Sequence, residues 1–156
     1  MASWRDVRRC ALALPGSSET ASRDHRAWVV NDKFFVWERP LRKSDLRALG
    51  EGAPDGPILG VRTAGLEMKE VLLARDPRVY FTTPHFDGYP AVLVQLDKIA
   101  LEELKDVVLE AWLARAPENV VSAFLQERRS PPVKRARPRS AARSPRATKR
   151  SGRSTC

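Results

Sequence analysis

Arginine is the residue type most clearly placed for chemistry, because it is concentrated at the C-terminal end of the chain. Of 28 Lys and Arg residues, eleven lie at or after Arg128, whereas none of the 19 Asp and Glu residues does. The planar guanidinium stays charged and matches phosphate, and its contact with a duplex releases counterions. We therefore predict nonspecific, salt-sensitive binding to DNA, and the residues leave RNA open as an alternative. The predicted nucleic-acid contacts are Arg128, Arg129, Lys134, Arg135, Arg137, Arg139, Arg143, Arg146, Lys149, Arg150 and Arg153.

The composition changes at this point of the chain. Residues 1–127 hold 17 basic and 19 acidic residues, a net charge of −2, so the excess positive charge lies in residues 128–156. That segment has no large apolar residue except Val133, and such a chain buries too little surface to offset the entropy of ordering. We predict a folded domain over 1–127 and a disordered basic tail over 128–156. A tail that is merely solubilising is the alternative.

The sequence shows no complete set of catalytic or metal-binding residues. Ser17, Ser18 and Ser22 lie near His25, but no glycine elbow presents a nucleophile. Cys10 falls inside a helical pattern with no neighbouring histidine, and the two histidines of the chain are too far apart to indicate zinc. We expect a non-catalytic protein without a metal ion or cofactor.

Apolar periodicity predicts the elements of the 1–127 domain. Helical spacing alternates with short β-branched and aromatic runs, and Asn31-Asp32 and Asp87-Gly88 are turn pairs. Short connections between strands favour an antiparallel arrangement. The fold class is therefore α+β, a mainly antiparallel sheet of about five strands packed against helices on one face. The predicted helices are 3–14, 44–49, 66–75, 101–112 and one from Pro117, and the strands are 27–30, 33–38, 58–63, 79–82 and 91–96.

Tryptophan could stack on unpaired bases, but most of the four tryptophans fit a core better. Trp4 and Trp112 lie on the apolar stripes of predicted helices. Trp28 and Trp37 lie on strands, and only these two are candidates for exposure on the sheet.

Several segments resemble the MmcQ/YjbR family. They are Leu12-Ala13-Leu14-Pro15-Gly16, Lys33-Phe34-Phe35-Val36, and Tyr80-Phe81-Thr82-Thr83-Pro84-His85-Phe86 before Gly88-Tyr89-Pro90-Ala91-Val92. The resemblance covers roughly residues 3–116 and leaves out the tail. It implies a fold similar to the CyaY/frataxin type and a double-wing DNA-binding role, without catalytic residues. Iron binding does not follow from a shared fold, since function resides in sites.

Four polar residues near these segments form the candidate groove of the domain. Lys33, Arg62, Lys69 and His85 flank the resembling strands, where they could contact phosphate or be ordinary surface residues. Their clustering on one surface would favour DNA binding. A closed apolar pocket would favour the alternative, a small-ligand or protein-interaction module with a generic polyanion-binding tail.

The expected location is the cytoplasm, with nucleoid association if the partner is DNA. No apolar run approaches the roughly 20 residues of a membrane span, and the first residues lack the apolar segment of a signal peptide. We therefore expect no membrane partner. The sequence leaves open the target site, the oligomeric state and the biological process.

Overall fold

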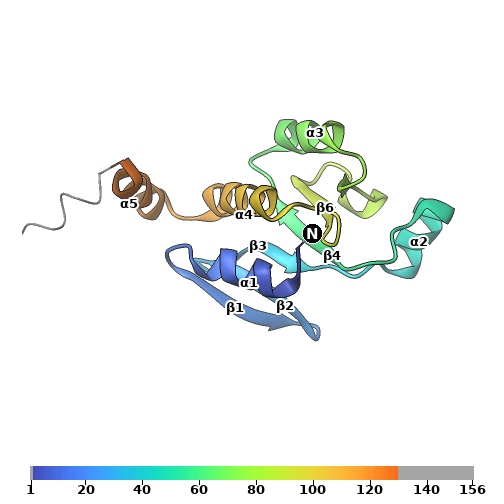
Figure 1. Cartoon of the computed structure of the whole chain (residues 1–156), viewed down its shortest axis with the longest axis horizontal. Helices are drawn as coiled ribbons and strands as arrows, with labels where there is room; N and C mark the ends of the chain where they lie inside the picture. The colour runs from blue at the N-terminus through green and yellow to red at the C-terminus, as the bar shows by residue number, and fades with distance from the viewer. Residues whose placement is uncertain (1, 130–156) are drawn as a thin grey trace, which may run out of the picture. The chain divides into compact units, whose positions relative to one another are not determined.

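A six-stranded antiparallel sheet organises the chain. The computed structural model describes residues 2–129, and within them the strand order is β1-β2-β3-β4-β6-β5 (Figure 1). The predicted α+β class with an antiparallel sheet and packed helices is confirmed. The strands are β1 (Ser17–Ser22), β2 (His25–Val30), β3 (Lys33–Glu38), β4 (Ile58–Arg62), β5 (Tyr80–Phe81) and β6 (Ala91–Gln95).

The sheet has one strand more than the five that the sequence indicated, because β1 was taken for a loop. Its sequence Ser-Ser-Glu-Thr-Ala-Ser has no apolar alternation, and all but its first residue are exposed. The strand forms because its backbone pairs with β2, from Ser17 opposite Val30 to Ser22 opposite His25. Backbone pairing at a sheet edge leaves no periodic signal in side-chain hydrophobicity.

Two tight turns build the first three strands. Arg23 and Asp24 (φ 53° and 68°) join β1 to β2, and Asn31 and Asp32 (φ 51° and 63°) join β2 to β3. Two consecutive positive φ angles match the right-handed twist of hairpin strands, and Asn and Asp tolerate this conformation. The second turn was predicted from its residues. The first has Arg at a position that usually excludes it.

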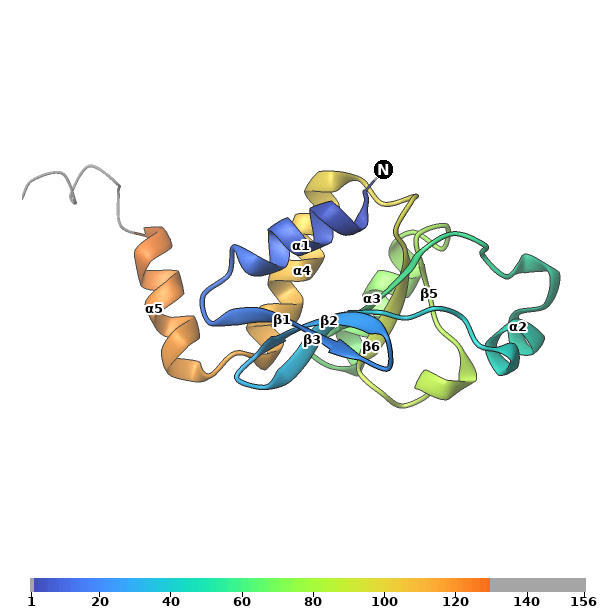
Figure 2. The same ribbon diagram turned by 90° about the horizontal axis from the view of Figure 1, so that it is seen from below.

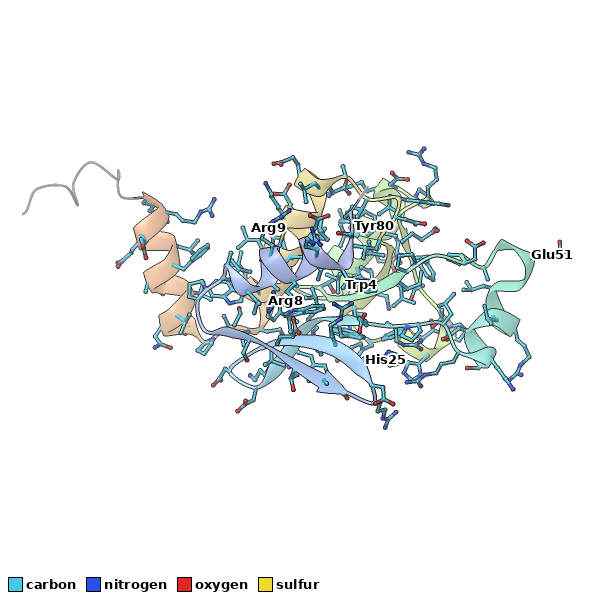
Figure 3. All side chains as sticks on the ribbon, turned by 60° about the horizontal axis from the view of Figure 1, so that its bottom comes forward. Trp4, Arg8, Arg9, His25, Glu51 and Tyr80 are labelled. Carbon is cyan, nitrogen blue, oxygen red and sulfur yellow. The ribbon has the colours of Figure 1, made fainter. Side chains whose placement is uncertain are left out.

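Helices cover one face of this sheet. The helix α1 (Trp4–Leu12) begins in a capping box between Ser3 and Asp6, and it lies against α4 (Leu101–Arg115) over the strands (Figure 2). Arg8, labelled in Figure 3, pairs with Glu19 of β1 at 2.9 Å. A third helix, α3 (Leu66–Arg75), borders α4 along a cavity of about 300 Å³ lined by Val61, Leu72 and Val107.

The main core lies between these helices and the sheet. Trp112, Leu104 and Val7 from the helices are fully buried, together with Trp28 and Val36 from the strands. The Trp28 indole also donates a hydrogen bond to Glu19 at 3.1 Å, so Trp28 is a core residue. Of the two candidates for exposure, Trp37 alone keeps part of its surface, on the opposite face.

A smaller apolar cluster lies on that opposite face, away from α1 and α4. It is made by Ile58, Ala91, Leu93 and Phe86, with Trp37, Leu41 and Phe81 packed at its margin. Trp37 lies directly over Gly60, where any Cβ would collide with the indole. The short helix α2 (Lys43–Leu49) and two turns of 3-10 helix, Gly50–Gly52 and Pro84–Phe86, belong to the connections around this cluster.

The chain divides into two units at Val121, and the last helix, α5 (Glu118–Arg129), runs through this point. Arg128 and Arg129, predicted as the start of the tail, form the last turn of α5, where the Arg128 guanidinium lies 5.3 Å from the Phe124 ring. The predicted disorder of the remaining tail concerns residues 130–156, which lie outside the described residues.

Candidate functional site

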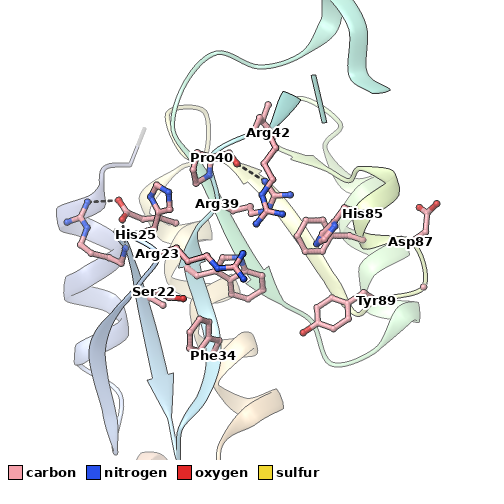
Figure 4. A pocket seen from close by; sticks show the side chains of 17 residues that line it. Ser22, Arg23, His25, Phe34, Arg39, Pro40, Arg42, His85, Asp87 and Tyr89 are labelled. Atoms are coloured by element: carbon pink, nitrogen blue, oxygen red, sulfur yellow. Dashed lines mark hydrogen bonds and ion pairs between the residues drawn. The ribbon is translucent and has the colours of Figure 1, made fainter. Parts of the chain in front are cut away.

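The face of the sheet opposite α1 and α4, called the open face below, carries an open cavity of about 860 Å³ (Figure 4). Three segments far apart in sequence line it. They are the β1–β2 turn with neighbouring strand residues, the connection 39–42 after β3, and the loop 85–89 around the second 3-10 turn. Arg23 projects from the first, Arg39 and Arg42 from the second, and His85 and Tyr89 from the third. We call this the arginine cavity.

Arg39 is the most constrained side chain of the arginine cavity. Its side chain is 7% exposed, and its Nη1 lies 2.9 Å from the Asp45 carboxylate and 2.6 Å from the Pro40 carbonyl oxygen. The guanidinium carbon also lies 5.2 Å from the centre of the Phe86 ring. Its Nη2 is buried and has no hydrogen-bond partner. Such a group normally finds a partner in a folded protein, so an unused donor here favours a ligand oxygen.

Asp45 fixes this part of the arginine cavity. Its carboxylate also accepts the backbone N–H of Arg42 at 2.8 Å, which starts α2. Burial by itself would raise the pKa of Asp45, but the Arg42 N–H and the Arg39 guanidinium outweigh it and lower that pKa below its usual range. The carboxylate is therefore charged at neutral pH and orients Arg39 as a fixed cation.

Lys69 holds the loop that forms the opposite wall. It is 5% exposed, and its Nζ donates to the carbonyl oxygens of Phe86 and Tyr89 at 2.5 and 2.9 Å. Burial lowers the pKa of Lys69, with Asp87 and Glu70 opposing the shift. Because its buried Nζ donates hydrogen bonds to these two carbonyl oxygens, Lys69 stabilises the loop instead of offering a free cation to a ligand.

Two exposed aromatic rings line the arginine cavity. Phe34 is 40% and Tyr89 44% exposed, which is unusual for side chains of this size. Arg62 donates to the Tyr89 hydroxyl at 3.0 Å, and its guanidinium carbon lies 5.0 Å from the ring centre. The Tyr89 ring is therefore held in place at the margin, in a position to stack on a planar ligand.

A second lining arginine, like Arg39, is already paired with a carboxylate. Arg26 pairs with Glu38 at 2.8 Å and lies 5.5 Å from the Trp4 ring. Burial would raise the pKa of Glu38, but hydrogen bonds from Arg26 lower it overall. Arg23 and Arg42 are the lining arginines without an ion pair among residues 2–129, and the exposed Asp87 on the loop opposes them.

The four predicted groove residues do not gather on one surface. His85 lines the arginine cavity, and Arg62 contacts it through Tyr89. Lys69 is buried beneath the loop, and Lys33 is the first residue of β3, next to the Asn31-Asp32 turn and outside the lining. The predicted contacts from Lys134 to Arg153 lie outside the described residues.

Sequence reasoning missed the cations and rings that the structure brings together, namely Arg23, Arg39, Arg42, Phe34 and Tyr89. The basic run Arg39-Pro40-Leu41-Arg42-Lys43, directly after a strand, was a usable signal. The role of Arg23 had no signal, because the strand that precedes its turn was taken for a loop.

Residues that could support metal binding or catalysis are not grouped for either in the described part of the chain. Residues 2–129 contain no group of three His, Cys, Asp or Glu residues that could hold a metal ion. Ser22 and His25 are cross-strand neighbours, and both are exposed. Burial raises the pKa of Cys10 against the lowering effect of Arg9, which disfavours a reactive thiolate.

None of the helices within residues 2–129 is both long and apolar enough to span a lipid bilayer.

Comparisons with known proteins identify relatives of the whole fold. A family model described as YjbR matches residues 12–114. The uncharacterized proteins Rv2570 of Mycobacterium tuberculosis and Mb2600 of Mycobacterium bovis are each 51% identical over 128 residues, covering 80% of this chain and 97% of theirs. The crystal structure of Deinococcus radiodurans protein DR2400, with a DUF419 domain, matches with a TM-score of 0.58 and 20% identity, over 84% of this chain and 91% of that one. This last likeness supports the fold alone.

Proposed function

The chain belongs to the YjbR family, and from the chemistry of its arginine cavity we propose that it is a non-catalytic nucleic-acid-binding protein with DNA as its partner. The observation that carries the proposal is the grouping of Arg23, Arg39 and Arg42 with exposed aromatic rings around one opening. Arginine binds phosphate through a planar fork, and aromatic rings stack on bases.

The position of these cations matters because the folded domain has no general positive charge. Residues 1–127 carry a net charge of −2, so attraction to a polyanion has to arise where cations are locally concentrated. The arginine cavity is such a place. The double-wing role implied by the family resemblance would then reside in the β1–β2 turn and the loop 85–89, which project on either side of it.

The basic residues from Arg128 to Arg153 complete the proposal. Eleven cations with no acidic neighbour would contact phosphate without reading sequence. In this division the C-terminal cations supply most of the affinity, and the arginine cavity supplies any preference for a particular nucleic-acid form. Association with the nucleoid would follow.

A pair of double variants with equal net charge tests the contribution of the arginine cavity. Arg23→Asn with Arg42→Gln removes two lining cations, and Asn tolerates the positive φ at position 23. Arg5→Gln with Arg47→Gln removes two exposed cations that do not line it. We expect the first pair to reduce the slope of log K against log salt for DNA by up to about 1.8, and the second to leave it unchanged.

Equal slopes for the two double variants would refute a role for the arginine cavity in phosphate binding. A chain that ends at Arg129 retains all of α5, and its DNA affinity measures how much binding remains without residues 130–156. Complete loss of DNA binding in that chain would assign the affinity to the tail alone.

A small-ligand module is the second candidate, because one observation favours it. The volume of the arginine cavity, about 860 Å³, falls within the range of small-molecule sites. It is open and partly charged instead of closed and apolar, so a ligand that fits it must itself be anionic.

A further inference from the structure

The unused donor of Arg39 identifies where an anion would bind. Arg39 is fixed on three sides, by Asp45, by the Pro40 carbonyl and by the Phe86 ring, so its guanidinium cannot turn to water. Nη2 is buried without a partner although the side chain lines an open cavity. Nη2 has almost no accessible surface, so a phosphate oxygen reaches it only when a neighbouring side chain moves aside, and the contact is then a charge-assisted hydrogen bond.

A second cation stands at the same end of the arginine cavity. Figure 4 shows the side chains of Arg39 and Arg42 projecting toward one end, with His85 on the loop opposite them. Arg42 is exposed, and its backbone N–H, not its side chain, is used by Asp45. The Arg42 guanidinium is thus free to close on an anion that Arg39 holds.

The other end is aromatic. Phe34 and Tyr89 lie away from the Arg39 end in Figure 4, and both rings remain about two-fifths exposed. The partly buried Trp37 of β3 also lines the arginine cavity. A cavity with cations at one end and open rings at the other matches a ligand with a phosphate at one end and a flat ring at the other.

We infer that the arginine cavity binds one unpaired nucleotide, with its phosphate on Arg39 and Arg42 and its base against Phe34 or Tyr89. This inference rests on the proposed function and narrows the ligand to unpaired nucleotides. A base stacked and paired within a duplex has no free face or edge to enter a concave site, whereas an unpaired base does. The nucleotide is either a free mononucleotide or a member of a single strand.

Calorimetric titrations of the full chain test the inference. The probes are deoxythymidine 5′-monophosphate, thymidine, inorganic phosphate, single-stranded (dT)20, and a hairpin duplex with the same number of phosphates. We expect the monophosphate to bind more tightly than thymidine or phosphate alone, and (dT)20 more tightly than the duplex. Binding by the monophosphate identifies a free nucleotide as sufficient, whereas ring-dependent binding by (dT)20 alone identifies a nucleotide within a strand.

Variants assign the two ends of the ligand. Phe34→Leu and Tyr89→Leu each remove an exposed ring. The substitution that removes the ring on which the base stacks should weaken binding roughly 5- to 100-fold. Tyr89→Phe keeps that ring and should retain most of the binding. Arg42→Gln should weaken binding of the monophosphate about 10-fold, while Arg47→Gln, in the helix that Arg42 precedes but outside the lining, should not.

Arg39→Lys preserves the positive charge but removes Nη2, so it should weaken the monophosphate while thermal unfolding checks the fold. If this variant unfolds, Arg42→Gln carries the phosphate test.

The inference is overturned if the duplex binds at least as well as (dT)20 and neither ring variant has an effect; the proposed nucleic-acid function would then still stand. Binding of the monophosphate without binding of either nucleic acid would support the inference and refute the proposed function. Absence of binding by every probe would refute both.

Discussion

The two faces of the sheet are built on opposite principles although the same strands form both. On the helix-covered face Trp28, Trp112 and Leu104 are completely buried and form the main core. On the other face, the apolar cluster around Leu93 borders an open cavity with arginines and exposed rings. Successive side chains of a strand point to opposite faces, so one strand can supply core residues to one face and cavity residues to the other.

The comparison indicates that stability and recognition are separated in this fold. The covered face buries its large side chains completely, whereas the open face has a fixed ion pair, an unused donor and solvent-accessible rings. Changes on the first face should therefore affect unfolding, and changes on the second should affect binding with smaller effects on the fold. The following predictions test that separation, from the largest expected effect on stability to the smallest.

Trp112→Ala should destabilise the protein most, because it removes a fully buried indole that also donates to the Pro15 carbonyl at 3.0 Å. We expect a loss of about 3–5 kcal/mol in the free energy of unfolding, measured by urea denaturation. Leu66→Ala, at a position that is 49% exposed, is the control and should change little. A loss below about 1 kcal/mol for Trp112→Ala would contradict the assignment of the core.

Asp45→Ala tests the exception on the open face, a buried ion pair. Removing the carboxylate leaves the Arg39 charge uncompensated, and we expect a loss of about 3 kcal/mol in thermal unfolding experiments. The exposed Glu51, on the following 3-10 turn, supplies the control Glu51→Ala. Equal stability of the two variants would show that the pair does not hold the arginine cavity.

Lys69→Met should loosen one wall of the arginine cavity. The variant leaves the Phe86 and Tyr89 carbonyl oxygens without their donor, at a cost of about 1–3 kcal/mol. Amide hydrogen exchange in residues 84–90 should accelerate more than exchange in α4. Lys98→Met, at an exposed position, is the control, and uniform acceleration over the whole chain would argue against a local role for Lys69.

The smallest effect should appear in acid. The folded-state pKa of Asp45 is lowered, so the stability it contributes is fully present above its unfolded value near 4 and is lost as the pH falls through the lower folded value. The free energy of unfolding should therefore decline below about pH 4, less steeply in Asp45→Asn than in the unmodified protein. Parallel pH curves would show that Asp45 titrates alike in both states.

Much of the fold could be predicted from the sequence, because periodic burial leaves a periodic signal. The stripe Leu104, Val108 and Trp112 defined α4, and Asn31-Asp32 defined the turn of the β2–β3 hairpin. The strand β1 was missed because it is polar and is held by backbone pairing. Trp28 was ambiguous, since alternation along a strand does not tell which face the helices cover.

The candidate site was harder to predict, because the position of a residue near a motif does not determine which way its side chain points. Lys69 lies near the resembling segments, yet its Nζ turns inward to the loop carbonyls. His85 lines the arginine cavity, and Arg23, from a turn about 60 residues earlier in the sequence, lines it as well. Such a pairing depends on strand order, which local sequence patterns do not contain.

The sequence by itself determined the α+β class, the segregation of charge between residues 1–127 and the C-terminal end, and the family to which the chain belongs. Local propensity, hydrophobic periodicity and charge act over a few neighbouring residues, so they can be read directly from the chain. Only the tertiary structure decided which cations face a ligand. It placed Arg39 between Asp45 and Phe86 with one donor unused, and it left Phe34 and Tyr89 open beside it, because the antiparallel strand order brings these distant segments to one face.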